Sequence, residues 1–248
     1  MKILNYLKKL GKIVAKESVL YPVEASALDR TIIDRCKPFS MTSRERLWAT
    51  ISATKYIVNN KICGAFVECG VWRGGSSMAM VMALKSLGVT DRFIFLFDTF
   101  SGMTVPTKKD LDNSGALAKT LLIQADKCGG NNIWCIASLE DVQNNINKLG
   151  YPEDRLVFVK GDVAITLMDK SILPDKIALL RLDTDWYEST KIEMEVLFPR
   201  LVRGGVCLID DYGHWQGAQQ AVDEYLEENR IYPLLHVTDY TGRAFIKT

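Results

Sequence analysis

The stretch that decides the fold is Phe66-Val67-Glu68-Cys69-Gly70-Val71-Trp72-Arg73-Gly74-Gly75-Ser76-Ser77. Apolar residues lead up to an acid, a glycine-rich turn follows, and a small helix rich in Met and Ala continues to Leu87. This pattern predicts a buried strand that ends in a tight turn, where backbone amides can approach a ligand closely. Taken alone, the stretch indicates a nucleotide-binding loop without saying which nucleotide it binds.

Short apolar strands alternate with helical patterns along the rest of the chain. Strands are predicted at 65–69, 92–97, 155–160, 177–182 and 205–209. Two closing strands at 232–237 and 243–247 are predicted to form a hairpin. Helices are predicted at 76–87, 138–149, 162–170, 187–202 and 215–229. This alternation predicts a doubly wound α/β fold with a mostly parallel sheet of seven strands.

Two segments fall outside this alternation. Residues 1–43 are predicted to form an N-terminal cap or oligomerisation segment. Within it, 1–16 have the pattern of a basic amphipathic helix that docks on its own domain or on a second subunit, and 17–43 are predicted to be irregular chain. Ser43 is placed to cap a helix over 44–59, where the main domain (44–248) begins. Residues 99–135 form an irregular insertion that is too long for an ordinary loop, and such insertions are often lids.

Composition excludes several classes of protein. The 248 residues are 48% hydrophobic, and 31 basic residues balance 30 acidic ones, so nothing indicates a nucleic-acid partner. Six cysteines lie without a CxxC pair beside only two histidines, which predicts reduced thiols and no zinc site. No apolar run reaches the ~20 residues of a transmembrane helix, and no signal peptide is apparent. We therefore expect a soluble, cytoplasmic protein.

Two acids end the first two predicted strands. Glu68 is suited to accept hydrogen bonds from an ammonium group, whereas it would repel a pyrophosphate, and the turn after it lacks the GxGxxG of dinucleotide enzymes. Asp98 stands where an acid commonly binds ribose hydroxyls. Together they favour a nucleoside that carries an amino-acid tail. The structural alternative, a satisfied acid near a helix N-terminus, is equally compatible with Glu68 alone.

Four aspartates cluster at two later strand ends, in Leu182-Asp183-Thr184-Asp185 and in Ile209-Asp210-Asp211. Carboxylates this close repel one another unless a cation or a proton intervenes. Asp183, Asp210 and Asp211 supply hard oxygen ligands suited to Mg²⁺, and Asp185 is left to accept a proton from a substrate hydroxyl. The alternative is helix capping by Asp185 and Asp211, which explains only one acid at each strand end.

Aromatic residues and one histidine accompany these acids. His214 is a second candidate for the general base, although a single loop histidine more often has neither a catalytic nor a binding role. Three tryptophans are expected to border the cleft, where they either stack on a sugar or adenine ring or simply cover the sheet edges: Trp72, Trp186 and Trp215.

Four motifs, in this order, resemble the macrocin O-methyltransferase family, whose members use S-adenosylmethionine and Mg²⁺ to methylate hydroxyls, typically on sugars of antibiotics. They are Val67–Ser76, Phe97–Gly102, Arg181–Thr190 and Asp210–Tyr212. The resemblance covers about residues 40–248. It implies a Rossmann-like class I methyltransferase fold with an N-terminal helical cap, usually in a homodimer, and a small-molecule or sugar substrate.

The resemblance also implies roles for individual residues. Glu68 and Gly70 would hold the methionine part of the donor, in a turn that also contains Val71 and Trp72. The residues on its ribose side would be Asp98, Ser101 and Gly102. The metal ligands would be Asp183, Asp210 and Asp211, and the general base Asp185.

One segment departs from the family pattern. Residues 160–167 match the position that lines the adenine, with Asp162 and Thr166 as the donor-binding candidates. Family members often carry an aromatic residue after the glycine and an acid before the threonine, where this chain has Asp162 and Ile165. Met41-Thr42-Ser43 falls where the cap meets the main domain and would close over the donor.

Three other functions remain open on sequence grounds. A catechol-type aromatic O-methyltransferase would use the same fold and a similar metal. A nicotinamide oxidoreductase is disfavoured by the missing GxGxxG and by Glu68. A non-enzymatic module that contacts a membrane surface through residues 1–16 would leave the acid clusters unexplained. The acceptor itself is not encoded in any readable motif, because the cap and the insertion shape that pocket.

Overall fold

Seven strands form one sheet in the order β3-β2-β1-β4-β5-β7-β6 in the computed structural model, which describes residues 20–127 and 132–248. The strands are β1 (Ala65–Cys69), β2 (Ile94–Asp98), β3 (Leu156–Lys160), β4 (Ile177–Leu182), β5 (Leu201–Ile209), β6 (His236–Val237) and β7 (Arg243–Ile246). β3, β2, β1, β4 and β5 run parallel, and β7 runs antiparallel to both β5 and β6. The predicted mostly parallel, seven-stranded sheet is confirmed.

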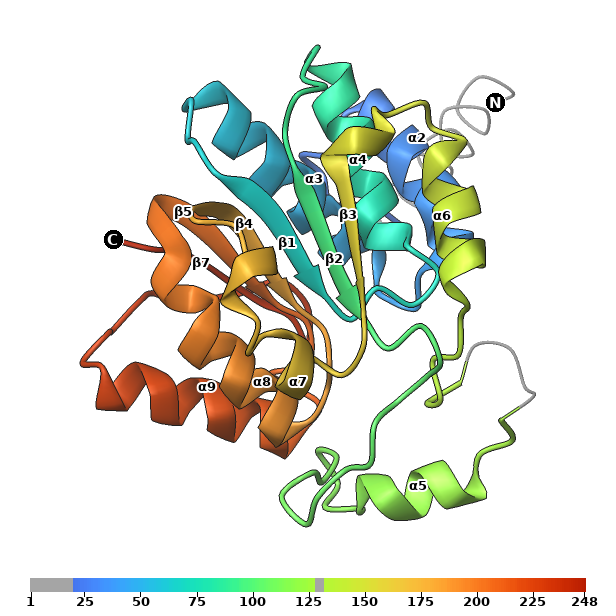
Figure 1. The fold of residues 1–248 in the computed structure, drawn as a ribbon, viewed down its shortest axis with the longest axis vertical. Helices are drawn as coiled ribbons and strands as arrows, with labels where there is room; N and C mark the ends of the chain where they lie inside the picture. The colour runs from blue at the N-terminus through green and yellow to red at the C-terminus, as the bar shows by residue number, and fades with distance from the viewer. Residues whose placement is uncertain (1–19, 128–131) are drawn as a thin grey trace, which may run out of the picture.

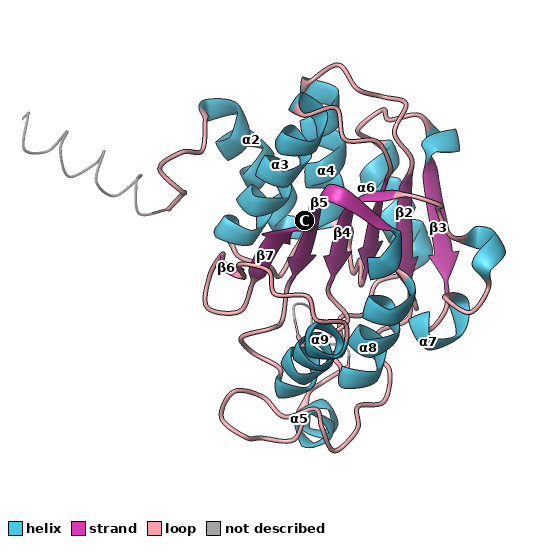
Figure 2. Cartoon of the chain, turned by 90° about the vertical axis from the view of Figure 1, so that its left-hand side faces the viewer, coloured by secondary structure: helices cyan, strands magenta, loops and turns pink. Residues whose placement is uncertain are grey.

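Helices cover both faces of the sheet (Figures 1 and 2). One layer contains α2 (Ala27–Cys36), α3 (Arg44–Asn59), α4 (Gly75–Ser86) and α6 (Leu139–Asn147). The other contains α7 (Val163–Thr166), α8 (Tyr187–Val196) and α9 (Gln216–Glu228). Successive strand side chains point to opposite faces, so Phe66 packs in the first apolar core and Val67 in the second. All five residues of β1 are buried, and burial on both faces explains why the strand is apolar apart from Glu68.

The prediction of irregular chain over 17–43 is wrong, because this segment contains helix α2 (Ala27–Cys36). α2 begins with a capping box, in which Ser26 Oγ accepts from the Asp29 amide and Asp29 Oδ2 accepts from the Ser26 amide. That signal stands in the sequence and was missed within 17–43. The predicted cap at Ser43 is confirmed, because its hydroxyl accepts from the Arg46 amide at 3.1 Å. The predicted helix over 1–16 lies outside the described residues.

Several predicted elements are shorter than expected. The helix predicted over 187–202 ends at Val196, a 3₁₀ turn that contains Pro199 follows, and β5 already begins at Leu201, which pairs with Ile177. Proline and the tertiary pairing of β5 with β4 therefore end the helix early. The elements predicted over 162–170 and 232–237 likewise shrink to Val163–Thr166 and His236–Val237.

Strand order places the crevice of the sheet between β1 and β4. From β1 the chain moves outward to β2 and β3, and it then returns to β4 on the other side of β1. Ligands of open α/β sheets bind at such a switch point, beyond the carboxyl ends of the strands. The insertion over 99–135, which carries α5 (Ala118–Gln124), lies beyond these strand ends (Figures 1 and 2). Within 20–127 and 132–248, no helix is long and apolar enough to cross a membrane.

Candidate active site

A cavity of about 470 Å³ opens at this switch point. Its walls come from the carboxyl ends of β1, β2, β4 and β5, from the segment before α3, and from the insertion. The predicted site residues that line it are Glu68, Gly70, Val71, Trp72, Asp98, Gly102, Asp162, Asp183, Asp185, Asp210, Asp211 and His214. Of the predicted donor-binding residues, Ser101 and Thr166 do not line it. The cavity therefore brings the predicted donor turn and the acid clusters together.

The turn after β1 lies against the backbone that follows β4, where the Asp183 amide donates to the Cys69 carbonyl at 2.9 Å. Gly70 has a φ of 81°, and a Cβ built there would lie 1.8 Å from the carbonyl oxygen of Asp183. Only glycine fits such a contact, since a side chain would push the two strand ends apart. The glycine thus lets the turn after β1 and the first aspartate of the acid cluster come into contact.

Replacing Gly70 by alanine is expected to destabilise the fold by on the order of 3 kcal/mol, because backbone strain and a backbone clash add together. Gly115→Ala is the matched control, since Gly115 also has a positive φ (87°) but faces open space. Urea unfolding should give the control a loss of only about 1 kcal/mol. Equal losses for the two variants would contradict the close approach of β1 and β4.

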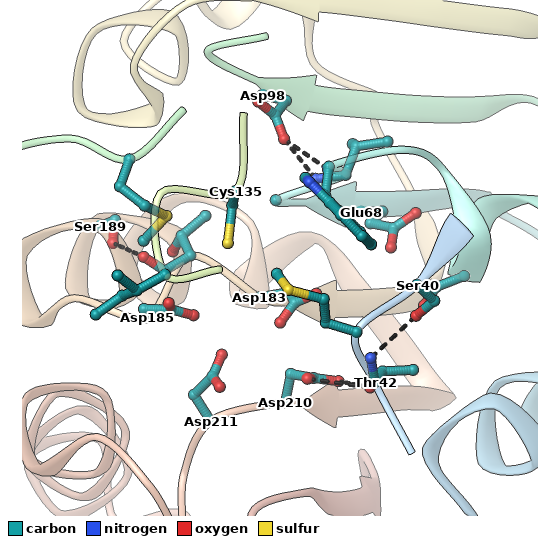
Figure 3. A pocket seen from close by; sticks show the side chains of 18 of the residues that line it. Ser40, Thr42, Glu68, Asp98, Cys135, Asp183, Asp185, Ser189, Asp210 and Asp211 are labelled. Carbon is teal, nitrogen blue, oxygen red and sulfur yellow. Dashed lines mark hydrogen bonds between the residues drawn. The ribbon is translucent and has the colours of Figure 1, made fainter. Parts of the chain in front are cut away.

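Asp98 organises the glycine-rich turn from the end of β2. Its Oδ2 accepts from the amides of Val71 (2.6 Å) and Trp72 (3.0 Å) (Figure 3). Its Oδ1 accepts from the amide of Phe100 at 2.7 Å. The two turn amides therefore point at a carboxylate of the protein. Asp98 holds the turn in shape and also lines the cavity.

Glu68 is buried at the end of β1 and does not stand free. Arg181 Nη1 donates to its Oε1 at 2.9 Å, and the Ser77 hydroxyl donates to its Oε2. Burial raises the pKa of Glu68 to about 7, against the opposing effects of Arg181 and Ser77. The side chain is therefore both an ion-pair partner and part of the cavity wall. It has the partners expected of a structural acid, and it also lies where a ligand-binding acid would lie.

Arg181 is the centre of charge under the cavity floor. Its guanidinium is 2% exposed and contacts three carboxylates, those of Glu68, Asp183 and Asp210. Nη1 donates to Asp183 Oδ2 at 2.6 Å, and Nη2 donates to Asp210 Oδ1. The sequence motif contains this arginine, but the sequence reading assigned it no role. A charged residue within an otherwise apolar strand was the available signal.

Asp210 is held from two sides. Besides Arg181, Arg46 of α3 forms an ion pair with it, and the Thr42 hydroxyl donates to it at 3.1 Å (Figure 3). Burial acts to raise the pKa of Asp210, but the two arginines outweigh it and hold the pKa below its ordinary value. Arg46 also pairs with Asp239 at 2.9 Å. These contacts fasten the N-terminal segment to the floor of the cavity.

Asp183, Asp185 and Asp211 form a second group in the same floor. Each offers an oxygen that lies within 4.8 Å of the other two. Burial and mutual repulsion raise the pKa values of Asp183 and Asp211 well above the ordinary range, and burial raises the pKa of Asp185 to about 7. Asp211 Oδ2 is buried and accepts no hydrogen bond from the described residues. Hard oxygens with an unsatisfied atom suit a divalent cation.

The capping alternative receives no support from the geometry. α8 and α9 begin after Trp186 and Trp215, and neither N-cap residue makes a side-chain capping bond. Asp185 instead occupies a left-handed turn with a φ of 68°, an uncommon conformation that aspartate adopts more readily than most residues. Asp162, a predicted adenine contact, does cap α7 by accepting from the Ala164 amide at 2.9 Å.

His214 also lines the cavity. Its Nδ1 is 2.9 Å from the Tyr240 hydroxyl, and partial burial lowers its pKa, which favours the neutral ring. Trp72 and Trp215 line the cavity as expected, whereas Trp186 does not. Trp186 is 2% exposed and packs edge-on against Trp215, with ring centroids 5.0 Å apart. The expectation that Trp186 borders the cleft was wrong, because it fills a small core beneath the insertion.

Glu193 of α8 is a buried acid that no sequence motif marks. It is 0% exposed, Thr184 Oγ1 donates to its Oε1 at 2.9 Å, and Oε2 has no hydrogen-bond partner among the described residues. Burial raises the pKa of Glu193 to about 8, so at neutral pH the carboxyl is mainly protonated. It supports the turn between Asp183 and Asp185 from below.

Glu193→Gln is expected to stabilise the protein, and more so as the pH rises. The folded state keeps the Glu193 proton up to a pKa of about 8, whereas the unfolded chain loses it near the ordinary value of 4.5. Wild-type stability therefore falls between these two pH values, on the order of a few kcal/mol from this group. Melting curves at pH 5 and pH 8.5 should show a gap between variant and wild type that widens at pH 8.5. A constant gap would contradict the buried, protonated acid.

Comparison with a solved structure defines the class. The structure of the O-methyltransferase NovP superimposes with a TM-score of 0.73 at 27% identity, over 85% of this chain and 82% of that one. Together with a cavity at the β1/β4 switch point, this makes the fold that of a class I, Rossmann-like methyltransferase. A model of the macrocin-O-methyltransferase (TylF) family matches residues 23–247, so the chain belongs to that family.

Two curated relatives extend over most of the chain. Demethyldecarbamoylnovobiocin O-methyltransferase of Streptomyces niveus is 29% identical over 209 residues, 84% of this chain and 76% of that protein. The 8-demethyl-8-(2,3-dimethoxy-alpha-L-rhamnosyl)-tetracenomycin-C 4'-O-methyltransferase of Streptomyces olivaceus is 31% identical over 203 residues, 82% of this chain and 73% of that protein. The protein is thus an S-adenosylmethionine-dependent O-methyltransferase, and the resemblance seen in its motifs is confirmed.

Proposed function

We propose that the protein transfers a methyl group from S-adenosylmethionine to a hydroxyl of a sugar on a glycosylated small molecule. The relatives support this, because the tetracenomycin enzyme and a mycinamicin III 3''-O-methyltransferase of Micromonospora griseorubida are both named for methylation of such molecules. The observation that carries the proposal is that one cavity joins the glycine-rich turn to a floor of aspartates. Antibiotic glycosides and other glycosides are alike compatible with this chemistry.

We infer that the donor lies over the glycine-rich turn between β1 and α4. Gly70 lines the cavity at this turn, and Glu68 and Asp98 offer carboxylates to the amino and ribose groups of the donor. Asp162 faces the adenine side from the start of α7. Ser101 and Thr166, which do not line the cavity, are the weakest of the predicted donor-binding residues.

The acid floor fits a Mg²⁺ ion, and Asp183 and Asp211 would hold it, since both belong to the ligand set predicted from sequence and to the clustered group. When bound, Mg²⁺ lowers the pKa of a hydroxyl at its site. Asp210 was predicted as the third ligand, but its oxygens accept from Arg181, Arg46 and Thr42. We propose that Asp210 mainly balances the charge of the two arginines.

Asp185 is the proposed general base. Its pKa of about 7 suits proton uptake near neutral pH, and its carboxylate adjoins Asp183 and Asp211. The acceptor hydroxyl gives its proton to Asp185, its oxygen forms a bond to the methyl carbon, and the bond from that carbon to sulfur breaks. The products are a methyl ether and S-adenosylhomocysteine. The cavity contributes positioning and exclusion of water.

Asp185→Asn is expected to lower kcat about 100-fold or more, with little change in acceptor KM, because a general base contributes 10²–10⁴-fold. Raising the Mg²⁺ concentration should not restore the rate if Asp185 is the base. Restoration by excess Mg²⁺ would instead make Asp185 a metal ligand. Asp210→Asn, assayed over the same Mg²⁺ range, is the comparison, and His214→Gln tests the second candidate base. Unchanged turnover of Asp185→Asn would transfer the role to His214 or to water.

The function is tested in two steps. S-adenosylmethionine or S-adenosylhomocysteine should raise the melting temperature, and the shift should be compared with and without Mg²⁺. A panel of glycosides and catechols is then incubated with the donor and analysed for a mass gain of one methyl group. Methylation of catechols alone would replace the sugar proposal by the catechol-type alternative. A nicotinamide oxidoreductase finds no support in the family, and the absence of any spectral change with nicotinamide cofactors would close that option.

The oligomeric state and the cellular compartment of the protein are also proposals. We propose a cytoplasmic homodimer, on the basis of the resemblance, and light scattering on a sizing column measures the assembly directly. A monomer at micromolar concentration would contradict it. Contact of residues 1–16 with a membrane surface is tested by flotation of the protein with anionic vesicles, with and without that segment.

A further inference from the structure

Asp110, in the insertion, is a fully buried acid to which neither the sequence motifs nor the proposed chemistry assigns a role. Its exposed fraction is 0%, and both of its oxygens accept hydrogen bonds. Oδ2 accepts from the Thr107 amide at 2.6 Å and from the Thr107 hydroxyl at 3.0 Å. These two bonds close a turn within the insertion. Burying a carboxylate requires such partners, so the site is built for this side chain.

The other oxygen leaves the insertion and reaches the methyltransferase core. Asp110 Oδ1 accepts from the amide of Tyr187 at 2.7 Å, and Tyr187 is the first residue of α8. The first amides of a helix lack partners within the helix, and Trp186 makes no side-chain cap here. Asp110 therefore supplies the missing cap from 77 residues earlier in the chain. A carboxylate is also favourable at the positive end of the helix dipole.

The contact between Asp110 and Tyr187 fits only because the neighbouring residue of α9 has no side chain. Gly217 of α9 faces Asp110, and a Cβ at this position would lie 2.2 Å from Asp110 Oδ1 and 3.1 Å from the Tyr187 amide nitrogen. Two further bonds join the same parts, from Trp186 Nε1 to the Thr104 carbonyl at 3.2 Å and from the Gln216 amide to the Leu111 carbonyl at 2.8 Å. The insertion is thus fastened to the starts of both α8 and α9.

These anchors flank the residues proposed for catalysis. Tyr187 follows Asp185 by two residues, and Asp185 sits in a left-handed turn that must be held in place from outside. The insertion also supplies one wall of the cavity, through Met103, Thr104, Leu121, Ile133 and Cys135. A displacement of the insertion would therefore move the wall and release the turn at Asp185 together.

We propose that Asp110 is a positioning residue, which sets the turn at Asp185 by capping α8 and thereby ties the acceptor-side wall of the cavity to the general base. This inference rests on the role proposed for Asp185. By this inference the insertion does more than shape the pocket. Catalysis also requires that the insertion stay docked on the starts of α8 and α9. The donor half of the cavity, around Gly70 and Asp98, should not depend on Asp110.

The test compares three variants of the full-length protein. Asp110→Ala removes the cap, Gly217→Ala crowds it while leaving Asp110 in place, and Asp110→Asn keeps an oxygen for the Tyr187 amide. The expected kcat loss is about 10- to 100-fold for the first two variants, as for a small misplacement of a catalytic group. It should be smaller for Asp110→Asn. The Kd of S-adenosylmethionine, measured by calorimetry, should stay within about threefold. Asp169→Ala is the control, since Asp169 also caps a short helix but is exposed and outside the cavity.

Each variant is assayed well below its own melting temperature, so that global unfolding does not enter the rates. Asp110→Ala and Gly217→Ala combined should lose little more than either alone, because both act on one contact. Folded Asp110→Ala and Gly217→Ala variants with wild-type kcat, or a parallel loss of donor binding, would overturn the inference. If Asp185→Asn is fully active, Asp185 is not the general base. If Asp185→Asn is inactive but Asp110→Ala is fully active, only the positioning role of Asp110 is refuted.

Discussion

Asp183→Ala is expected to lower kcat/KM about 1,000-fold or more and to abolish stimulation by Mg²⁺. Asp183 belongs to both the predicted ligand set and the clustered carboxylates, and its loss would remove the ion's contribution of several kcal/mol to the transition state. Donor binding should change little, since Glu68 and Asp98 remain at the turn. Initial rates over a range of Mg²⁺ concentrations, with the donor Kd by calorimetry, give both quantities.

Asp154→Ala is the matched control for this variant. Asp154 has a side chain that is 73% exposed, and it does not line the cavity, so its removal should leave kcat/KM within about twofold. Full activity of the wild type in excess chelator would refute the metal site. Retention of Mg²⁺ stimulation by Asp183→Ala would move the ion to the other aspartates.

Arg181→Met is expected to have the largest effect on stability. The arginine is buried among Glu68, Asp183 and Asp210, and its removal leaves three carboxylates without their shared cation. Breaking a buried ion pair by removal of one partner costs about 3–5 kcal/mol, because the remaining charge has no compensation. Urea unfolding at pH 7 measures the loss, and part of it should be recovered at pH 5, where the remaining acids take up protons more readily.

Arg155→Met is the control, since Arg155 pairs with Asp154 at the surface, and exposed pairs contribute about 1 kcal/mol or less. A loss of similar size in the two variants would contradict the central place of Arg181. If Arg181→Met does not accumulate as folded protein, Arg181→Lys provides the measurement. Lysine keeps the charge but cannot contact three carboxylates through a planar fork, so an intermediate loss is expected.

These results would bear on how the cavity tolerates so many acids. Arg181 and Arg46 neutralise one side of the floor, at Asp210 and Glu68, whereas Asp183, Asp185 and Asp211 are left beside one another with raised pKa values. The division separates carboxylates whose charge the two arginines balance from a group in which only Asp183 contacts an arginine. The second group is therefore the part of the floor best suited to the chemistry proposed.

Much of the fold could be predicted because it depends on local patterns. The apolar run before Gly70 and the similar runs that end at Leu182 and Ile209 predicted three central strands, and all three are present. Errors came where local signals compete with packing. The capping box at Ser26 marks a helix where irregular chain was predicted. The helix predicted to extend to 202 ends before Pro199, because β5 begins at Leu201 and pairs with β4.

The sequence by itself determined that carboxylates follow the strands of a parallel sheet, and because parallel strands end at one edge, it placed those carboxylates around one cleft. Only the tertiary structure decided which acids are paired. Arg46 meets Asp210 across 164 residues of chain, and Asp110 caps a helix 77 residues away. Periodicity in a sequence reports burial and local geometry, whereas the partner of a buried charge depends on which segments the whole fold brings into contact.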